Sequence, residues 1–126
     1  MAKHLILALT NPIKGNEEAY NHWYDNVAMP VYKSLPGLIP LGRFKAADVP
    51  HLYPFEMDNQ FQYLSLYYFE TDDLNAFMEK LKASFAERPE YSFSPDIDQS
   101  CFFEPIFVAL GDVNFEPLDR YESLKR

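Results

Sequence analysis

Residues 60–85 read QFQYLSLYYFETDDLNAFMEKLKASF, and this stretch joins the clearest strand pattern of the chain to its clearest helix pattern. In the first part, Tyr63 and Tyr67 alternate with Leu64 and Leu66, which indicates a strand with one aromatic and one aliphatic face. A helix is expected to follow, with Thr71 as N-cap and an end before Arg88-Pro89, because one apolar stripe at helical spacing is formed by Leu74, Phe77, Met78, Leu81 and Phe85.

The segments outside this stretch repeat the alternation of strands and helices. Residues 3–10, 38–47 and 101–110 are predicted strands, and a helix is expected from the N-cap Asn16 to about Met29, where Pro30 must kink or restart it. The order β-α-β-β-α-β is the ferredoxin-like plan. The sequence therefore predicts an α+β fold, with a four-stranded antiparallel sheet and two helices on one of its faces.

Both faces of this sheet are expected to be buried. Leu5 and Leu7 alternate with Ile6 and Ala8 in the first strand, so neither side of that strand is polar. Two helices can cover only one face, and a second copy of the same sheet would cover the other in a two-fold dimer. We expect a homodimer that forms through the face without helices.

Length and charge limit the class of protein. The chain has 126 residues, which suits one domain (residues 1–110) and a charged tail (residues 111–126). Its net charge of −8 argues against binding to nucleic acid or to an anionic membrane. The single Cys101 and the short apolar run at the start favour a reducing, cytoplasmic location.

Residues 15–48, GNEEAYNHWYDNVAMPVYKSLPGLIPLGRFKAAD, contain a helix motif followed by a Pro-Gly turn and an Arg-Phe strand. This pattern resembles the dimeric α+β barrels related to the EthD and antibiotic-biosynthesis-monooxygenase-like families. The resemblance implies a dimeric barrel and a broad set of activities: monooxygenases, cyclases, isomerases, lyases and haem degraders. It is carried by Glu17, Tyr20, Trp23, Tyr24, Pro30, Pro36, Gly37, Arg43 and Phe44.

The chain departs from the resembling proteins at one position. Where they carry a histidine two residues before the proline of the helix motif, this chain has Ala28 before Met29 and Pro30. In those proteins the histidine is the natural acid–base candidate. Three explanations are open: the chemistry is lost, another group supplies it, or Ala28 is an engineered replacement.

Three histidines remain as candidates. His22 shares a helix face with Asp25, so it is either an oriented general base or part of a solvated face. His51 lies in the long connection 48–59, which could form a lid over a ligand or be exposed to solvent. His4 lies on a strand face with apolar neighbours, as a buried histidine or a cavity residue. Haem with one of these histidines as axial ligand is a third functional possibility.

Aromatic side chains are the candidate ligand-binding residues. Strand and helix periodicity place them on facing surfaces, where they form either an ordinary aromatic core or the walls of a pocket with phenol hydroxyl groups. Glu104 in the last predicted strand is a proton acceptor with a raised pKa if it is buried, or a rim residue if it is not. The candidate walls are Tyr20, Trp23, Tyr24, Tyr63 and Tyr67.

Two functional hypotheses follow. The first is a cofactor-independent enzyme that acts on a hydrophobic aromatic or polyketide-like carbonyl compound. It would abstract a proton, leading to oxygenation, cyclisation, isomerisation or bond cleavage, unless Ala28 makes it inactive. The second is a non-catalytic, ligand-binding or stress-associated dimeric barrel. No metal site is expected, since Asp96 and Asp98 have no third ligand at suitable spacing.

Overall fold

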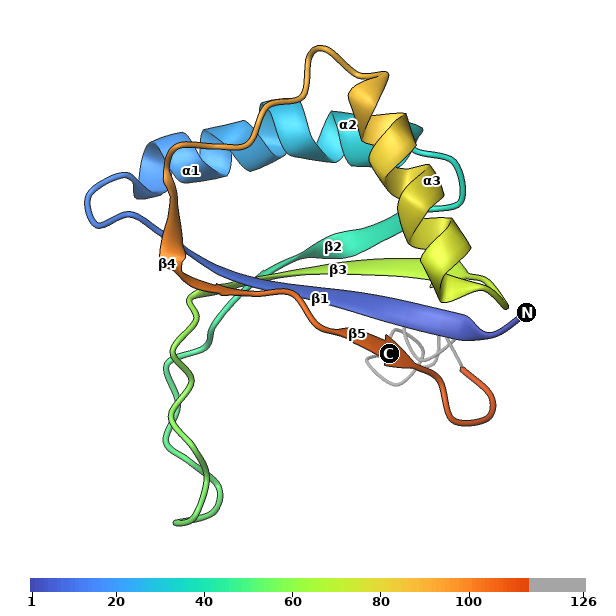
Figure 1. Ribbon diagram of the computed structural model, residues 1–126. Helices are drawn as coiled ribbons and strands as arrows, with labels where there is room; N and C mark the ends of the chain where they lie inside the picture. Colours follow the sequence, from blue (N-terminus) through green and yellow to red (C-terminus); the bar gives the residue numbers. More distant parts are fainter. Residues whose placement is uncertain (114–126) are drawn as a thin grey trace, which may run out of the picture.

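The structure is a computed structural model, and it describes residues 1–113 (Figure 1). A layer of helices covers one face of an antiparallel sheet. The predicted tail falls almost wholly outside the described residues. No helix within residues 1–113 is long and apolar enough to cross a membrane. In chain order the elements are β1 (Lys3–Pro12), α1 (Glu17–Trp23), the π-helical η1 (Tyr24–Ala28), α2 (Met29–Ser34), β2 (Ile39–Lys45), β3 (Tyr63–Glu70), α3 (Leu74–Ala86), β4 (Ile97–Phe103) and β5 (Ile106–Val108).

The sheet has the order β2-β3-β1-β4. The short strand β5 pairs with the other end of β1, along the same edge that β4 occupies. The expected fourth strand is therefore two strands, and the sheet has five instead of four. The break falls at Glu104-Pro105, because proline cannot donate a ladder hydrogen bond. The carbonyl oxygen of Pro105 still accepts a bond from the Leu7 amide at 3.0 Å, so the two halves stay on the same edge of β1.

The first helix continues beyond the predicted end near Met29. Helical backbone runs from Glu17 to Ser34, and its middle turn, Tyr24–Ala28, is a π-helix. Pro30 lacks the amide hydrogen that an α-helix would need, and its ring would crowd the carbonyl four residues earlier. The wider π turn directly before Pro30 accommodates the proline inside one continuous helical run.

The second helix confirms the predicted apolar stripe but not the predicted cap. Asp73 is the N-cap of α3, and its carboxylate accepts a hydrogen bond from the Ala76 amide at 3.0 Å. Thr71 lies two residues earlier, where its hydroxyl oxygen accepts from the Asp73 amide at 3.1 Å. The short loop ahead of α3 is thus fixed by two successive side-chain caps.

The register between β1 and β3 decides which side chains face the helices. Ile6 lies opposite Tyr67, and Leu7 lies opposite Leu66. Residues with even numbers in β1 are buried, as are Tyr63 and Tyr67 of β3, so this face is the one that the helices cover. Its core joins the sheet to the first helix through Ile6, Ala8, Val31, Leu35, Leu38, Tyr67 and Phe69.

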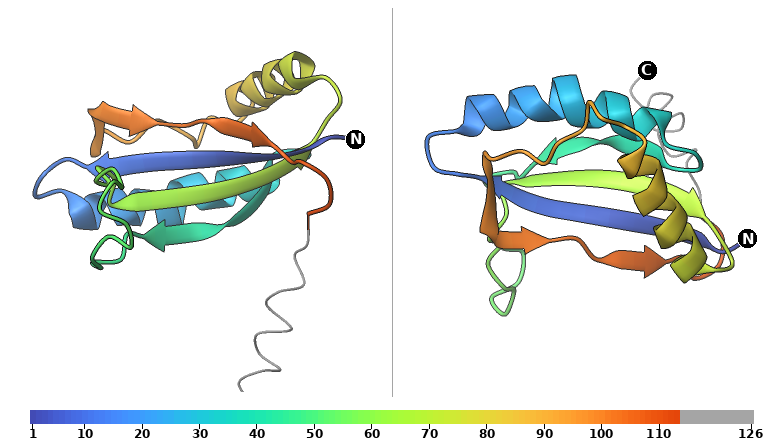
Figure 2. Two further views of the ribbon diagram at one scale, coloured as in Figure 1. Left: turned by 90° about the horizontal axis from the view of Figure 1, so that it is seen from below. Right: turned by 45° about the horizontal axis from the view of Figure 1, so that its top comes forward.

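The opposite face, which we call the open face, has no described helix on it (Figure 2). The partly exposed leucines of β1 and β3 lie at its centre. Around them, more than half of each of three phenylalanines is exposed: Phe44 (51%), Phe103 (54%) and Phe107 (56%). An apolar surface of this kind is typical of an interaction site, and the homodimer stays a prediction.

Residues 46–62, which we call the arm, leave the sheet between β2 and β3 and project to the side of the open face (Figure 1). Of the two alternatives for residues 48–59, the lid beneath the helices is wrong, and these residues are exposed to solvent. The base of the arm is tied to β1, because Asn11 Nδ2 donates to Gln60 O at 2.8 Å and Asn11 Oδ1 accepts from Gln62 N at 2.6 Å. These two bonds direct the arm away from the helical layer.

The open face can be tested with one charge. Leu66→Asp should abolish a homodimer of twice 14.7 kDa, because it places an unpaired carboxylate in the expected interface. Sedimentation velocity at micromolar concentration measures the mass, and Leu66→Asn is the uncharged control. A wild-type chain that sediments as a monomer would contradict the dimer prediction, as would an intact Leu66→Asp dimer.

Candidate functional site

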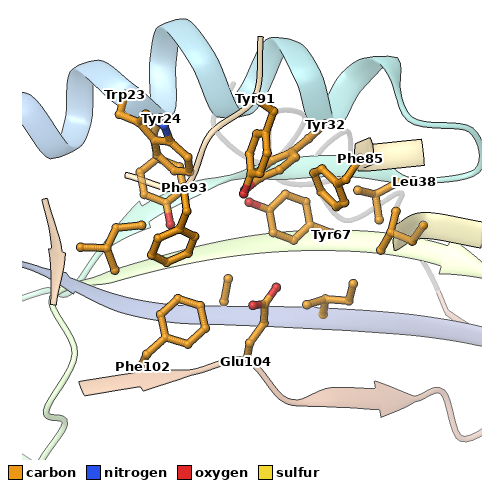
Figure 3. Close-up of a pocket in the computed structure, with 14 residues that line it drawn as sticks. Trp23, Tyr24, Tyr32, Leu38, Tyr67, Phe85, Tyr91, Phe93, Phe102 and Glu104 are labelled. Atoms are coloured by element: carbon orange, nitrogen blue, oxygen red, sulfur yellow. The ribbon is translucent and has the colours of Figure 1, made fainter. Parts of the chain in front are cut away.

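A pocket of about 160 Å³ lies between the helical layer and the sheet (Figure 3). Ile6 and Ala8 of β1 form part of its floor, and Leu38, Leu81 and Ile97 add aliphatic surface. Most of its wall is aromatic, which suits a flat apolar ligand. The aromatic residues are Trp23, Tyr24, Tyr32, Tyr67, Phe85, Tyr91, Phe93 and Phe102.

The segment between α3 and β4 closes the pocket on the helical side. Trp23 Nε1 donates to the Ser92 carbonyl oxygen at 2.8 Å, and the hydroxyl groups of Tyr32 and Tyr91 are 3.2 Å apart. These contacts hold Tyr91 and Phe93 over the sheet, so the cover of the pocket comes from this segment and not from residues 48–59. The first helix and the segment 87–96 therefore build the site together.

The buried phenol groups of the pocket are neutral hydrogen-bond donors. Burial raises the pKa of Tyr32 and Tyr67 far above the usual range, and it also raises the pKa of Tyr91. Figure 3 shows the hydroxyl groups of Tyr67 and Tyr91 directed toward the interior of the pocket. Protonated phenols in an apolar site can donate to a carbonyl oxygen or to an enolate oxygen.

Glu104 supplies the only carboxyl group among the lining residues, which include no Lys, Arg or His. It lies at the break between β4 and β5, and its carboxyl group points toward the hydroxyl groups of Tyr67 and Tyr91 (Figure 3). The residue as a whole is exposed at the edge of the pocket, but burial of its carboxyl group raises the pKa. A carboxyl group with a raised pKa is a stronger proton acceptor, once ionised, than an ordinary exposed one.

The candidate aromatic residues divide into two groups. Trp23, Tyr24 and Tyr67 line the pocket. Tyr20 is fully buried beside it and shares a hydrogen bond with the Thr10 hydroxyl. Tyr63 directs its hydroxyl to Glu17 and Asn21, away from the pocket, so these last two tyrosines are not lining residues.

The histidine candidates do not meet at the pocket. His22 is exposed on α1, where its Nδ1 lies 3.1 Å from Asn26 Nδ2. His51 is in the arm, with Nε2 3.2 Å from Asp58 Oδ1. His4 is buried at the other end of β1 and stacks on Phe69 with a centroid distance of 4.8 Å. None of the three is a lining residue, so the structure provides no base from them at this site.

Ala28 is fully buried in the cluster that contains Tyr20, Trp23 and Tyr24, and its methyl group does not line the pocket. The position where the resembling proteins carry histidine therefore offers no acid–base group here. In this chain the ionisable group of the pocket comes from the sheet side, through Glu104.

Arg43 of β2 supports the aromatic wall from behind. Its guanidinium carbon lies 4.3 Å from the centroid of the Tyr24 ring, and its Nη2 donates to Asn21 Oδ1 at 2.8 Å. The cation stacks against the ring and holds the side chain of Tyr24 in place. Among residues 1–113, no group of three His, Cys, Asp or Glu side chains could hold a metal ion.

Five lining aromatics were absent from the walls predicted from the sequence: Tyr32, Phe85, Tyr91, Phe93 and Phe102. Tyr32 could have been found, since Tyr24, Ala28 and Tyr32 are spaced by four residues along one helical face. Tyr91 and Phe93 lie in a long connection without secondary-structure periodicity, so their position had no comparable signal.

The stability of a Glu104→Gln variant tests the environment of this carboxyl group. Because its pKa is raised in the folded chain, ionisation favours unfolding as pH rises above the unfolded value of about 4.3. Glu104→Gln should therefore be more stable than the wild type at pH 7, and the advantage should vanish below about pH 4. Urea unfolding at both pH values measures this, with exposed Glu90→Gln as control. An equal stability difference at both pH values would contradict the expectation.

The similarity of this chain to known proteins is confined to its fold. No family model and no curated protein matches it. The crystal structure of an ethyl tert-butyl ether D (EthD) family protein from Bacillus halodurans C-125 is similar, with a TM-score of 0.53 and 17% sequence identity. The match covers 87% of this chain and 100% of that chain. The α+β chain, with its antiparallel sheet and two helices on one face, thus has an EthD-like fold, and the likeness shows the fold alone.

Proposed function

We propose that the protein is a cofactor-independent enzyme that binds a small aromatic carbonyl compound and moves a proton next to its carbonyl group. The observation that supports this best is the placement of Glu104, whose carboxyl group points into an aromatic pocket toward tyrosine hydroxyls. A base and neutral donors on one small apolar site are the groups that enolisation needs.

The proposed step uses only groups of the pocket. The Glu104 carboxylate takes a proton from the carbon next to the ligand's carbonyl, and the electron pair of that C–H bond forms the enolate. The hydroxyl of Tyr67 or Tyr91 donates a hydrogen bond to the enolate oxygen, where the negative charge develops. Protonated Glu104 returns the proton to the same or to a conjugated carbon, and the second outcome is an isomerisation.

The size and charge of the pocket narrow the ligand class. Its volume of about 160 Å³ is close to that of engineered protein cavities that take up benzene, so one aromatic ring fits. A polycyclic polyketide needs a larger site, in the range of about 300–1,000 Å³ that is usual for ligand pockets. No cation lines the pocket beside Glu104, which disfavours an anionic ligand. A neutral single-ring ketone or aldehyde fits both conditions.

The second candidate function is ligand binding without catalysis, and Ala28 favours it. In this alternative the pocket holds an aromatic molecule, and Glu104 contributes polarity but no chemistry. The two candidates differ in one measurable event, the exchange of a carbon-bound proton of the bound ligand.

Binding can be measured through Trp23, the only tryptophan of the chain, because its ring lines the pocket. A neutral phenyl ketone such as phenylacetone should quench its fluorescence in a saturable way. Tyr67→Phe should weaken binding by about 1 kcal/mol, roughly fivefold in Kd, through loss of one hydrogen bond. Tyr63→Phe is the matched control, since this hydroxyl bonds outside the pocket. Equal effects of both variants, or no quenching, would contradict the site.

Catalysis can be measured without knowledge of the natural substrate. In D₂O, the wild type should speed deuterium exchange at the carbon next to the carbonyl of phenylacetone, which proton NMR follows directly. Glu104→Gln should lower this rate at least roughly 100-fold, the usual contribution of a general base, while still quenching through Trp23. Glu90→Gln should match the wild type. Quenching without exchange in the wild type would support the binding protein over the enzyme.

A further inference from the structure

The arm carries the most exposed group of large apolar side chains in one described segment. Side chains of this size cost free energy in water when they stand together on a projecting loop. Neither of the candidate functions uses them, because no arm residue lines the pocket beneath the helices. The exposed fractions of these apolar side chains of the arm are 69% for Val49, 79% for Leu52, 52% for Tyr53, 81% for Phe55 and 89% for Met57.

Contacts within the arm give it a defined shape. The rings of Tyr53 and Phe55 stack with a centroid distance of 5.3 Å and an interplanar angle of 14°. Across the arm, His51 Nε2 lies 3.2 Å from Asp58 Oδ1. At its base, Ala46 N donates to Gln62 O at 2.8 Å, beside the two hydrogen bonds from Asn11. These contacts hold the exposed side chains of Val49, Leu52, Tyr53, Phe55 and Met57, which we call the apolar tip, at a defined place relative to the sheet.

The arm lies on the same side of the sheet as the open face (Figures 1 and 2). About eight extended residues out and eight back give it a reach of roughly 25 Å. Two packed sheets lie only about 10 Å apart. The arm would therefore extend past the side of any sheet that covers the open face. Its apolar tip would contact the layer of the covering molecule that lies behind that sheet.

The exposed apolar area favours a partner that touches both surfaces. From the usual size of aromatic and aliphatic side chains, the open face offers on the order of 600 Å². A stable interface buries about 800 Å² on each partner, so the open face alone falls short. The five arm side chains add on the order of 500 Å², which brings the combined surface into the range of a stable dimer.

We propose that the arm of each chain clasps a second copy of the chain, which lies on the open face in a two-fold homodimer. In such a dimer each contact occurs twice, so one arm and one sheet face of each subunit are both used. The charge of the arm supports a protein partner: it carries Asp48, Glu56 and Asp58 and no Lys or Arg. Acidic side chains repel the phosphate groups of nucleic acids and anionic lipids.

The wild-type chain tests the proposal by limited proteolysis. Chymotrypsin cuts after large apolar and aromatic residues, and the arm offers Leu52, Tyr53 and Phe55 in exposed positions. Cleavage at these sites should slow as the concentration rises, in parallel with the dimer fraction from sedimentation. A dimer whose arm is cut at the same rate at all concentrations would overturn the proposal. So would a monomer at every concentration, or an arm that is protected only by phosphatidylcholine vesicles.

A double variant tests the energetic contribution of the arm. Phe55→Ser with Met57→Ser should raise the dimer dissociation constant roughly 100-fold or more, because two large side chains lose their buried contacts. Leu74→Ser is the matched control, since Leu74 is exposed at the start of α3, on the helical side of the sheet. Circular dichroism and Trp23 fluorescence verify that each variant is folded. An unchanged dissociation constant in the folded double variant would overturn the proposal.

Discussion

The pairing of β1 with β3 is the constraint on which both surfaces of the molecule depend. With Ile6 opposite Tyr67 and Leu7 opposite Leu66, one face receives tyrosines and small residues, and the other receives leucines. A slip by one residue would exchange the two faces, because side chains alternate along a strand. The helices then would cover leucines, and the tyrosine hydroxyls of the pocket would lie on the open face. Site and expected interface are thus set by a single register.

The break at Glu104-Pro105 interrupts the ladder at the edge of the sheet without changing its register. A continuous edge strand would pair Glu104 with β1 and fix its side chain to one face by alternation. Pro105 interrupts the ladder of hydrogen bonds. The hydrogen bond that the Leu7 amide donates to the Pro105 carbonyl oxygen keeps this edge segment attached to β1. The register is the same on both sides of the break, with Phe103 opposite Leu9 and Ile106 opposite Ile6. Glu104 therefore keeps the face of Ala8, at the rim of an aromatic pocket, where its ionisation costs stability. Costs of this kind are common where a residue is placed for function.

The helices and strands whose apolar residues recur at regular helix or strand spacing could be predicted from the sequence. The stripe of α3 and the alternation of β1 and β3 gave correct elements and the correct face for Tyr63 and Tyr67. Two features could not be obtained in this way. Helical backbone continues past Pro30 because a π turn precedes it, and the roof of the pocket comes from residues 87–96 instead of the arm. The path of a long connection depends on distant contacts, such as the bonds from Asn11 and Trp23, which no local pattern encodes.

Because of the position of Glu104, the pocket has an ionisable carboxyl group although position 28 carries no histidine. Ala28 lies deep in the aromatic cluster, on the helical side, whereas Glu104 lies at the rim, on the sheet side. A carboxyl group at the rim can exchange its proton with solvent, while the deeper tyrosines remain neutral because burial raises their pKa. The proton-accepting carboxylate of Glu104 then lies near the entrance of the pocket, and the tyrosine hydroxyls that donate hydrogen bonds lie deeper inside it. A carbonyl compound that enters with its ring toward Trp23 would meet both groups, which is the arrangement that the proposed proton transfer requires.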